Sequence, residues 1–577
     1  MSDAHGGVTM RLLLPIISLT ILGSSLSLTA CMSDDEDGAD EDLGDIGDGK
    51  SDSFGVIDRE FTVSAGKSKR FSFTANAGFR VAVTQPTTAI ADRSDLTLSL
   101  KKPDGDHATA DATNEPTLVL DEGGGTAKFS LTVKNVGHKS VTGLLNVRPL
   151  GGFGDLPNPN APLPPDATWL PPALDAWPTS YVIFNNTGCG HDCTQTDSTA
   201  LAPRSVMIKM LVAAIQSVKQ GGTVRVSNYN ISSSNSSKPV VDALVWAMQT
   251  RGATVKIVMD DAQNIATSKT TWLAQNGAQV RFLNGMTYMN SSGPAVGIMH
   301  SKIVAVDDKV VLTGSNNFSS TGFIINEENS VVLRAPENAE RIRSFTCDID
   351  TMFEAGVEAG KPQKTDAERK TAVLALDACN GTDVWFPPTG LIATGESITQ
   401  TNVLAGISGA KKSIFIAPDM MANPTIVTAL IARARKAKAD GQAFSIKLIL
   451  DASPEALGNP AFGECLNAAS TKYDLDISVH YWPGTAEAFQ LMHHKFMVVD
   501  AAVPNGATLY NGSANYSSKA MKYSFENVTR YSTAQYRQVV DAFSARFDQL
   551  FAQGKDKAKL KTEDNLDIPA CPLGNSI

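Results

Sequence analysis

The hydrophobic pattern of the chain begins with a long region in which apolar and polar residues alternate. Between residue 54 and about residue 150 this alternation recurs in short runs such as Phe71-Ser72-Phe73-Thr74 and Leu96-Thr97-Leu98-Ser99-Leu100. Side chains two apart on a strand share one face, so the alternation is typical of strands that bury one side. Turn-forming clusters such as Pro103-Asp104-Gly105 separate the runs. We therefore predict a small antiparallel β-sandwich over residues 54–150, acting as a spacer or a surface-binding module.

From Tyr181 onward the pattern alternates between strands and helices, and it does so twice. The strand-like runs Val255–Asp260 and Ile446–Asp451 are near copies of each other. Further expected strands are 181–184, 223–226 and 280–283 in the first unit and 383–386, 413–416 and 479–482 in the second; expected helices are 206–220, 239–249, 401–411 and 425–439. This arrangement predicts an α/β fold made by internal duplication around a mixed sheet. A final amphipathic helix over 533–553 is expected to pack on the second half.

The first 53 residues carry the features of a targeting segment followed by a tether. An apolar run from Leu12 to Leu28 ends in Leu28-Thr29-Ala30-Cys31, which resembles a bacterial lipobox with Cys31 as the lipidated residue. Residues 34–52 hold ten acidic residues and one lysine, a tract that cannot bury apolar surface. We expect a signal peptide over 1–31, a disordered acidic tether over 32–53, and an extracytoplasmic protein that is either a membrane-anchored lipoprotein or secreted.

The acidic tract also changes how the net charge is interpreted. The whole chain has a formal charge of −10, of which the tract supplies −9, so the rest is close to neutral. A protein that grips a polyanion through its backbone phosphates normally carries a basic excess. Nucleic acid is therefore not the expected partner. After the β-sandwich, the proline-rich residues 151–179 predict a semi-rigid linker.

The chain has six cysteines besides Cys31, which allow 15 disulfide pairings. Closeness in sequence suggests the pairs Cys189–Cys193 and Cys347–Cys379, and an extracytoplasmic location would preserve them. Zinc is the competing interpretation for the segment from Cys189 to Cys193, which includes His191. A second ligand pair at suitable spacing is missing, so no metal site is predicted.

The chemistry of the chain is concentrated in a motif that occurs twice. His300-Ser301-Lys302 is followed by four apolar residues and Asp307, and His493-His494-Lys495 by four apolar residues and Asp500. Each copy is followed by Gly-Ser-x-Asn, which ends at Asn317 in the first copy and at Asn515 in the second. Eleven residues beyond each of these asparagines stands a glutamate followed by an asparagine, at Glu328 and at Glu526. Two copies with the same trailing pattern indicate a duplicated site.

The paired motifs resemble those of the phospholipase D superfamily, and the match covers about residues 180–555. The resemblance implies a duplicated α/β/α sandwich whose two halves, 180–360 and 361–577, bring both motifs into one cleft. It further implies a phosphodiesterase that works through a phosphohistidine without metal or cofactor. The residues that the resemblance places in the site are His300, Lys302, Asp307, Asn317, Glu328, His493, Lys495, Asp500, Asn515 and Glu526, with Ser315 and Ser513 supporting them. A degenerate, inactive duplicate is disfavoured because every position is filled in both halves.

The residue types fit this chemistry. Lysines and asparagine amides neutralise the anionic phosphate and the charge of the transition state. One histidine can attack phosphorus while the other protonates the leaving oxygen, and the second then activates water or an alcohol. The resemblance favours His300 as nucleophile and His493 as acid, although sequence symmetry leaves this open. It also implies that the two glutamates each accept the other ring N–H of a histidine. Asp307 and Asp500 are expected to be ion-pair and positioning groups and not proton carriers.

Two details separate the copies of the motif. His494 should face away from His493 on its strand and is interpreted as structural. Six residues separate Asp307 from the next glycine of the motif, whereas eleven separate Asp500 from its counterpart. The extra residues, 502–506, predict a longer hairpin turn that leaves the site undisturbed.

The substrate class follows less directly, because the superfamily includes enzymes for lipids and for nucleic acids. The near-neutral core, the expected lipid anchor at Cys31 and apolar loops at 285–289, 293–299, 418–421 and 460–462 favour membrane phospholipid, although Met and Phe are as often core residues. We predict a monomeric phospholipase D that hydrolyses or exchanges head groups. The alternatives are an extracytoplasmic nuclease, which a basic groove around Lys209, Lys219, Lys238 and Lys256 would support, and a cardiolipin-synthase-like phosphatidyltransferase.

Overall fold

The computed structural model describes residues 41–46, 57–75, 79–84, 95–113, 116–120, 127–149, 174–185, 201–202, 205–232, 234–263, 269–290, 293–452, 461–482, 491–503, 505–564 and 567–574. The expected signal segment, Cys31, the cysteines at 189 and 193, and the proline-rich stretch from 151 to 173 lie outside these residues. Within the described residues, no helix has both the length and the apolar character needed to cross a bilayer.

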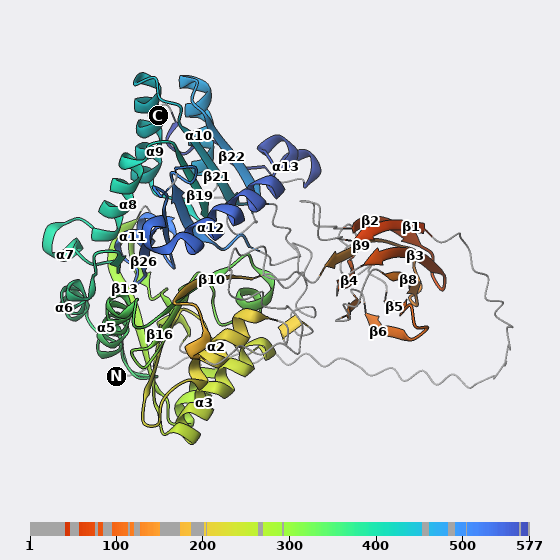
Figure 1. Ribbon diagram of the computed structural model, residues 1–577, viewed down its shortest axis with the longest axis horizontal. Coiled ribbons are helices and arrows are strands. Elements are labelled where there is room, and N and C mark those ends of the chain that lie inside the picture. The colour runs from red at the N-terminus through yellow and green to blue at the C-terminus, as the bar shows by residue number, and fades with distance from the viewer. Residues whose placement is uncertain are drawn as a thin grey trace, which may run out of the picture.

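The N-terminal region forms two β-sheets that share one core (Figure 1). One sheet has the strand order β1-β3-β8-β5-β6 and the other β2-β9-β4-β7. The strands are β1 (Glu41–Ile46), β2 (Ile57–Val63), β3 (Ser68–Ala75), β4 (Phe79–Thr84), β5 (Leu96–Lys101), β6 (His107–Thr113), β7 (Thr117–Leu120), β8 (Ala127–Asn135) and β9 (Val141–Pro149). Along β5 buried residues alternate with more exposed ones, as the sequence pattern predicted. The core includes Phe71, Phe73, Leu98 and Leu131.

Strand β1 differs from the expected disordered tether. Residues 41–46 pair in parallel with β3, from Glu41 opposite Phe71 to Ile46 opposite Ala75. The prediction of a disordered tether over 32–53 is therefore wrong for these six residues. It rested on the lack of apolar side chains, but an edge strand can be added through backbone hydrogen bonds alone.

The rest of the chain contains two sheets with the same strand order. The first is β10-β17-β16-β15-β11-β12-β13-β14 and the second β18-β26-β24-β23-β19-β21-β22. The first contains β10 (Ser180–Phe184), β11 (Thr223–Asn228), β12 (Thr254–Asp260), β13 (Gln279–Asn290), β14 (Gly293–Ile298), β15 (Lys302–Val306), β16 (Val310–Gly314) and β17 (Asn329–Arg334). The second contains β18 (Val384–Trp385), β19 (Ser413–Pro418), β21 (Ser445–Asp451), β22 (Ile477–Trp482), β23 (Lys495–Val499), β24 (Thr508–Gly512) and β26 (Val528–Ser532). Strand by strand, the second sheet repeats the first, so the duplication is present in the fold. Only β14 lacks a counterpart in the described part of the second half.

Helices cover both sheets on both faces. They are α2 (Val206–Gln216), α3 (Lys238–Arg251), α4 (Lys269–Gln275), α5 (Ala339–Ala355), α6 (Asp366–Leu376), α7 (Leu391–Thr394), α8 (Ile398–Gly409), α9 (Pro424–Ala439), α10 (Ala461–Tyr473), α11 (Ser518–Lys522), α12 (Thr533–Gln553) and α13 (Lys557–Glu563). Helices α2 and α3 form one core with the first sheet, and α8, α9 and α10 form another with the second. A third core joins α5, α12 and residues of both sheets. The two halves therefore share buried apolar surface.

Helix α12 occupies the bounds predicted for it, but it does not belong to the second half alone. It contacts β10 of the first half as well as β26 and β19 of the second. Phe543 on this helix packs edge-on against Phe184 of β10, with ring centroids 5.1 Å apart. The expectation that α12 packs on the second half is confirmed, but the helix also packs on the first half, because amphipathic periodicity identifies an apolar face and not the surface that covers it.

The extra residues in the second copy of the motif lie in the turn between β23 and β24. Val499 pairs with Thr508 at the end of that hairpin, whereas Val306 pairs with Val310 in the first half. The turn lies at the end of β23 opposite His493. The prediction that the insertion lengthens a hairpin and leaves the site undisturbed is confirmed.

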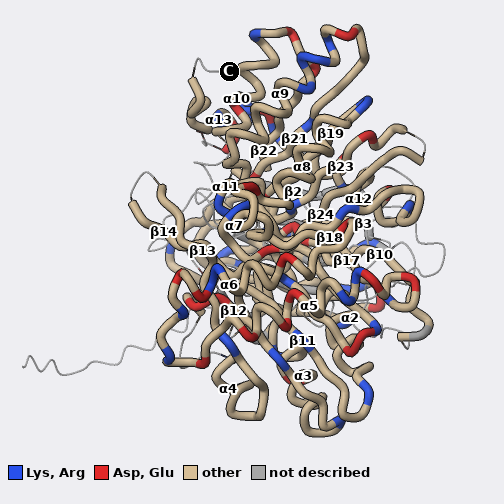
Figure 2. The backbone as a smooth tube through the Cα atoms, turned by 90° about the vertical axis from the view of Figure 1, so that its left-hand side faces the viewer, with Lys and Arg blue, Asp and Glu red and all other residues tan. Residues whose placement is uncertain are grey.

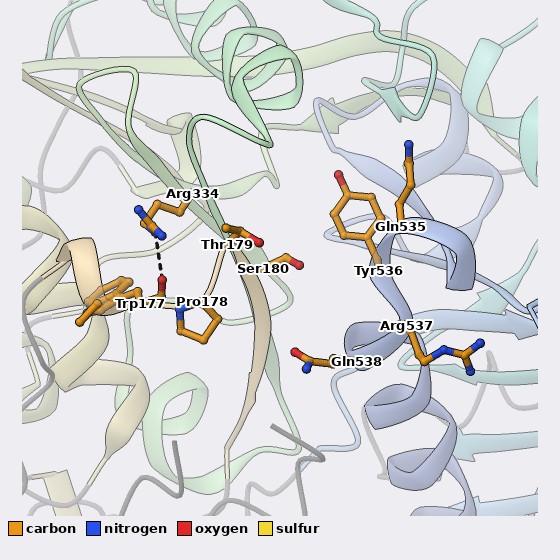
Figure 3. A pocket seen from close by; sticks show the side chains of 10 residues that line it. Trp177, Pro178, Thr179, Ser180, Arg334, Gln535, Tyr536, Arg537 and Gln538 are labelled. Atoms are coloured by element: carbon orange, nitrogen blue, oxygen red, sulfur yellow. Dashed lines mark hydrogen bonds between the residues drawn. The ribbon is translucent and has the colours of Figure 1, made fainter. Parts of the chain in front are cut away.

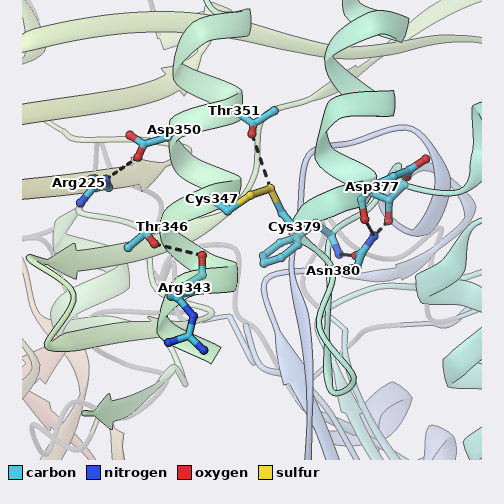
Figure 4. Close-up of a disulfide and its surroundings, with 11 residues drawn as sticks. Arg225, Arg343, Thr346, Cys347, Asp350, Thr351, Asp377, Cys379 and Asn380 are labelled. Carbon is cyan, nitrogen blue, oxygen red and sulfur yellow. Dashed lines mark hydrogen bonds and ion pairs between the residues drawn. A yellow bond between two sulfur atoms is a disulfide. The ribbon is translucent and has the colours of Figure 1, made fainter. Parts of the chain in front are cut away.

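Two disulfides are present among the described residues. Cys347 of α5 is bonded to Cys379, which follows α6, and this pair was predicted from closeness in sequence (Figure 4). Cys465 of α10 is bonded to Cys571, 106 residues further along the chain. The second disulfide holds the C-terminal segment, whose Ile568 is buried in the core of the second half.

The disulfide between Cys465 and Cys571 should contribute more to stability than the one between Cys347 and Cys379. The first closes a loop of 106 residues and the second a loop of 32. Chain entropy makes the longer closure more stabilising by about 1 kcal/mol. We expect the double substitution Cys465→Ala/Cys571→Ala to lower the midpoint temperature of the catalytic region further than Cys347→Ala/Cys379→Ala does, measured by calorimetry. The reverse order would mean that strain or local contacts, and not loop length, dominate.

Candidate active site

Both motif histidines immediately precede a central buried strand. His300 comes just before β15 and His493 just before β23, and every residue of the two strands is buried. Each histidine side chain is almost fully buried, with 7% of the residue surface exposed in both cases. The two motifs therefore place their histidines at equivalent ends of equivalent strands, as the duplication predicted.

Each histidine is held by the other half of the protein. His300 Nδ1 lies 2.9 Å from Glu526 Oε1 and 3.1 Å from its Oε2, and the His300 backbone N–H donates to Phe525 O at 2.8 Å. Reciprocally, His493 Nδ1 lies 2.8 Å from Glu328 Oε1, and the His493 backbone N–H donates to Glu327 O at 3.0 Å. The sequence predicted that the glutamates contact histidines but not that each contacts the histidine of the opposite half. With Nδ1 engaged, Nε2 is the nitrogen left for chemistry in both rings.

The two lysines of the motifs are buried beside the histidines. Lys302 Nζ donates to His300 O and Lys495 Nζ to His493 O, both at 2.7 Å. Burial lowers the pKa of Lys302 to about 7, and Lys495 acts in the same direction, while Glu526 and Glu328 oppose the shift. Two buried ammonium groups so close together form a site that favours an anionic ligand.

The serine and asparagine residues that follow each motif support the glutamates. Ser315 Oγ accepts from Asn329 N at 3.0 Å, and Ser513 Oγ accepts from Asn527 N at 2.9 Å. These contacts fix the Glu-Asn pairs at the start of β17 and just before β26. The side-chain oxygens of the other two predicted asparagines, at 317 and 515, are buried and make no hydrogen bond within the described residues.

Asp307 and Asp500 lie at the far ends of β15 and β23, on the order of 20 Å from the histidines by strand length. Both adopt a left-handed conformation, with φ values of 50° and 59°. Asp307 accepts from Lys219 N at 3.1 Å and Thr223 N at 2.9 Å, and Asp500 accepts from Lys412 N at 2.6 Å. Of the expected ion-pair and positioning roles, the contacts of the described residues support positioning: both carboxylates bind backbone amides at a turn, and neither makes an ion pair with a described residue. They position the strand and do not reach the reacting groups.

Sequence reasoning missed a second symmetric pair of aspartates. Asp260, at the end of β12, accepts from Met299 N at 2.9 Å, and Asp451, at the end of β21, accepts from Met492 N at 2.6 Å. Each carboxylate therefore fixes the residue before a motif histidine. The near-identical strands that end in these aspartates were the signal that could have identified them.

Sequence reasoning also missed an asymmetric pair, Tyr229 and Asp419. The register places Asn228 opposite Lys302 and Pro418 opposite Lys495, so the residues that follow them occupy equivalent positions. In the first half Tyr229 packs against His300, with ring centroids 5.2 Å apart. In the second half Asp419 Oδ2 lies 3.1 Å from Lys495 Nζ and 3.7 Å from His493 Nε2. Asp419 was predicted only as part of an apolar loop, and this assignment is corrected here.

His494 is structural, as predicted. Its side chain is fully buried, and its Nδ1 lies 3.0 Å from the amide nitrogen of Asn329. Its ring packs edge-on against Phe184 and Phe496. It links the two halves from the side of the strand opposite His493.

Burial and neighbouring charges shift the pKa values of the ionisable groups of the site in different directions. Burial lowers the pKa of His300 well below its usual value, and Lys302, Lys495 and His493 add to the shift. Burial raises the pKa of Glu526 to about 8. For Asp419, burial acts to raise the pKa, but Lys495 and His493 together outweigh it and lower the pKa. His300 is therefore neutral at neutral pH, while Asp419 is ionised.

Other concave or basic surfaces do not coincide with this site. A cavity of about 510 Å³ lies between Trp177, Arg334 and the start of α12, and no motif residue lines it (Figure 3). Lys238 pairs with Asp242 on α3, whereas Lys256 pairs with Asp350 on α5, which covers the opposite face of the sheet. Basic and acidic residues are interspersed over both halves (Figure 2). Lys238 and Lys256 therefore lie on opposite faces of the first sheet and do not line a common groove.

Comparison with known proteins identifies the class. Residues 211–348 and 403–551 each match the family described as "Cardiolipin synthase, PLD-like domain". One matched segment falls in each half and contains that half's motif. Each half of the chain therefore carries a segment that matches this PLD-like domain.

Curated relatives resemble only part of the chain. A mitochondrial cardiolipin hydrolase of Mus musculus is 27% identical over 118 residues, which are 20% of this chain and 48% of that protein. A phospholipase D of Rickettsia bellii is 27% identical over 143 residues, or 25% of this chain and 63% of the relative. The chain thus spans about half the length of the curated relatives it matches.

Two solved structures are similar to parts of the chain. Phosphatidylserine synthase of Haemophilus influenzae is 13% identical, covers 60% of this chain and 84% of its own, and superposes with a TM-score of 0.44. Nuc of Salmonella typhimurium is 25% identical, covers 31% of this chain and 97% of its own, and has a TM-score of 0.22.

The cross-half contact between His300 and Glu526 should be essential for turnover. Glu526→Gln keeps the size of the side chain but removes the carboxylate that orients the ring. We expect kcat on bis(p-nitrophenyl) phosphate to fall by roughly 10² to 10⁴-fold, as when a carboxylate that orients a catalytic histidine is replaced by its amide. Glu328→Gln tests the reciprocal contact. Asp350→Asn, which removes a partly buried carboxylate on α5, is the control. A loss below about threefold in both glutamine variants would contradict this role.

Proposed function

We propose that this protein is a phospholipase D that hydrolyses or exchanges the head groups of glycerophospholipids through a phosphohistidine. The observation that carries the proposal is the reciprocal arrangement of His300 with Glu526 and His493 with Glu328, beside two buried lysines. This arrangement offers two Nε2 atoms and two cations to one phosphodiester. A bound substrate would place its phosphorus atom between the His300 and His493 rings.

In the first step, Nε2 of neutral His300 attacks phosphorus. The bond from phosphorus to the head-group oxygen breaks, and its electron pair stays on that oxygen, which takes a proton from His493 Nε2. Lys302 and Lys495 stabilise the charge that develops on the non-bridging oxygens. Glu526 accepts the Nδ1 proton of His300 in a hydrogen bond, so the attacking nitrogen carries the lone pair.

In the second step, His493 acts as a base. It takes a proton from water or from an alcohol, whose oxygen attacks phosphorus, and the bond between phosphorus and His300 Nε2 breaks. Water gives a phosphatidate, whereas an alcohol gives a new phosphodiester. The residues in the site act identically on both acceptors, so the proposal includes hydrolysis and transfer.

An exposed apolar hairpin beside the site supports a lipid substrate. Strands β13 and β14 extend past the sheet and lead directly into His300. One face of the hairpin is fixed to the second half, because Tyr288 stacks on Tyr523 with ring centroids 4.7 Å apart. The opposite face carries Met289, which is 73% exposed, and Val296.

Basic residues lie next to this hairpin. Lys519 and Lys522 are on α11, directly before Tyr523, and Lys519 acts electrostatically on Glu526. Exposed apolar side chains beside ammonium groups fit the surface of an anionic phospholipid bilayer. The names of the relatives, which refer to cardiolipin and to phospholipase D, agree with such a substrate. Met286 and Met421, by contrast, are core residues and do not line an entrance.

We further propose that the protein acts outside the cytoplasm as a monomer, attached to a membrane through Cys31. The proposal rests on the lipobox-like sequence before Cys31 and on the presence of both motifs in one chain. Attachment would keep the enzyme close to its substrate, as short-range tethering raises the local concentration of a binding site.

The proposed activity predicts choline release that does not depend on metal. The full-length protein is incubated in EDTA with phosphatidylcholine vesicles and, in parallel, with single-stranded DNA. We expect choline release from the wild type and its loss in His300→Ala and in His493→Ala, because each step needs both rings. DNA cleavage without choline release would assign the protein to the nucleases instead. Choline release that stops in EDTA would contradict the proposed metal independence.

If the hairpin contacts the bilayer, substitutions in it should lower the rate on vesicles but not the rate on dispersed lipid. Met289→Ser/Val296→Ser should lower the rate on vesicles roughly 10-fold, because transfer of the two side chains into the bilayer contributes about 1–3 kcal/mol. The rate on a short-chain phosphatidylcholine below its micelle concentration should stay the same. Val136→Ser, an exposed apolar residue of the β-sandwich, is the control. Equal losses on both forms of lipid would show that the hairpin supports the site and not the interface.

A further inference from the structure

The two halves differ at one position next to the reacting groups. Strand β11 pairs with β15 and is followed by Tyr229, whereas the equivalent strand β19 pairs with β23 and is followed by Asp419. The glutamates, the lysines, and the aspartates at the ends of β12 and β21 come in matched pairs. In a fully symmetric site, either histidine could attack phosphorus and either could protonate the leaving oxygen. The difference between Tyr229 and Asp419 can assign these two roles.

Asp419 places a negative charge in direct contact with the second-half histidine and lysine, whereas it acts on His300 and Lys302 only as a weaker electrostatic contribution. The protonated form of His493 faces two carboxylates, because Nδ1 lies 2.8 Å from Glu328 and Nε2 lies 3.7 Å from Asp419. His300 faces one carboxylate, Glu526, and on another side the ring of Tyr229. A nearby carboxylate favours the imidazolium over the neutral ring.

The same carboxylate also acts on the lysines unequally. Asp419 Oδ2 lies 3.1 Å from Lys495 Nζ, whereas Lys302 Nζ lies over the ring of Tyr229, 5.6 Å from its centroid. Asp419 is itself held in place, since its backbone N–H donates to His494 O at 2.7 Å, and its side chain is buried. The charged groups that surround His493 are thus Glu328 from the first half, Asp419 and Lys495 from the second, with His300 and Lys302 across the site.

We propose that Asp419 is the positioning residue that makes His493 the proton donor and leaves His300 as the nucleophile. This inference rests on the proposed phosphohistidine mechanism and deepens it. Asp419 stabilises the imidazolium before the first step, and its ion pair with Lys495 holds that lysine on the leaving-group side. Asp419 also acts electrostatically on His300, but its direct contacts are with His493 and Lys495. Burial keeps His300 in the neutral form whose lone pair attacks phosphorus.

The proposal is tested by the dependence on the leaving group. Asp419→Asn removes the charge and keeps the shape. With phosphatidylcholine, whose leaving alkoxide needs a proton, we expect kcat to fall by roughly 100-fold or more, the contribution of a general acid. With phosphatidyl-p-nitrophenol, whose leaving group departs without a proton, the loss should be below about 10-fold. The basic limb of the pH profile for choline release should move to lower pH.

Matched variants separate this role from a structural one. Asp419→Glu should restore much of the choline release, because the carboxylate returns. Asp350→Asn, which removes an aspartate paired with Arg225 and Lys256 away from the site, should change neither rate. Equal losses of kcat on the two substrates in Asp419→Asn would overturn the proposal, since only the support of Lys495 or of the fold would then explain them.

The location of the covalent intermediate gives an independent test. In His493→Ala, the p-nitrophenyl substrate should still react in the first step, while the second step lacks its base. We expect the phosphoryl adduct to accumulate on His300, mapped by mass spectrometry at alkaline pH. An adduct on His493 in the reciprocal variant His300→Ala, with none on His300 in His493→Ala, would reverse the assignment and overturn the proposal.

Failure of the proposed substrate is distinguishable from failure of this inference. A wild type that cleaves DNA and releases no choline would refute the phospholipase assignment. The leaving-group comparison would then use alkyl and p-nitrophenyl esters of thymidine 5′-phosphate, with the same variants. A selective loss on the alkyl ester in Asp419→Asn would uphold the role of Asp419 for that substrate, and equal losses would overturn it.

Discussion

The structure depends on the exchange of contacts between each catalytic histidine and a glutamate from the other half. Glu328 and Glu526 are almost completely buried, and a buried carboxylate without a polar partner is costly. Each gains a histidine partner when the halves meet, Glu328 through His493 and Glu526 through His300. Neither half can build a complete site alone. The shared apolar core around α5 and α12 brings the halves together, and the buried polar contacts then fix how they meet.

Because the two halves are duplicates, the few positions at which they differ can be identified by comparing equivalent strands. Equivalent strands present equivalent histidines, lysines and serines, so most of the site is symmetric. The symmetry is broken where a tyrosine ring and a carboxylate occupy the same position, at Tyr229 and Asp419. It is also broken by the hairpin of β13 and β14, which has no counterpart in the described part of the second half. The first difference lies beside the motif histidines. The second lies on the exposed hairpin, where we propose contact with the lipid surface.

Not every residue of the repeated motif belongs to the chemistry. Asp307 and Asp500 bind backbone amides at turns far from the histidines. Their positive φ values place them where a short polar side chain tolerates the left-handed region better than most. A fixed spacing in sequence can therefore reflect the geometry of a hairpin as much as the geometry of a site.

The sequence by itself determined the duplication, the order of strands and helices, and the chemical groups of the site. These follow from local periodicity and from the repeated spacing of residues, and neither depends on which segments contact each other in the folded protein. The exchange of glutamates between halves, the placement of α12 on both halves, and the pairing of Cys465 with Cys571 were decided only by the tertiary structure. So was the position of Asp419 beside His493 and Lys495, since it lies 74 residues before His493 in a segment that resembles an apolar loop. Contacts between distant segments depend on how surfaces pack, and periodicity identifies a buried face without identifying what buries it.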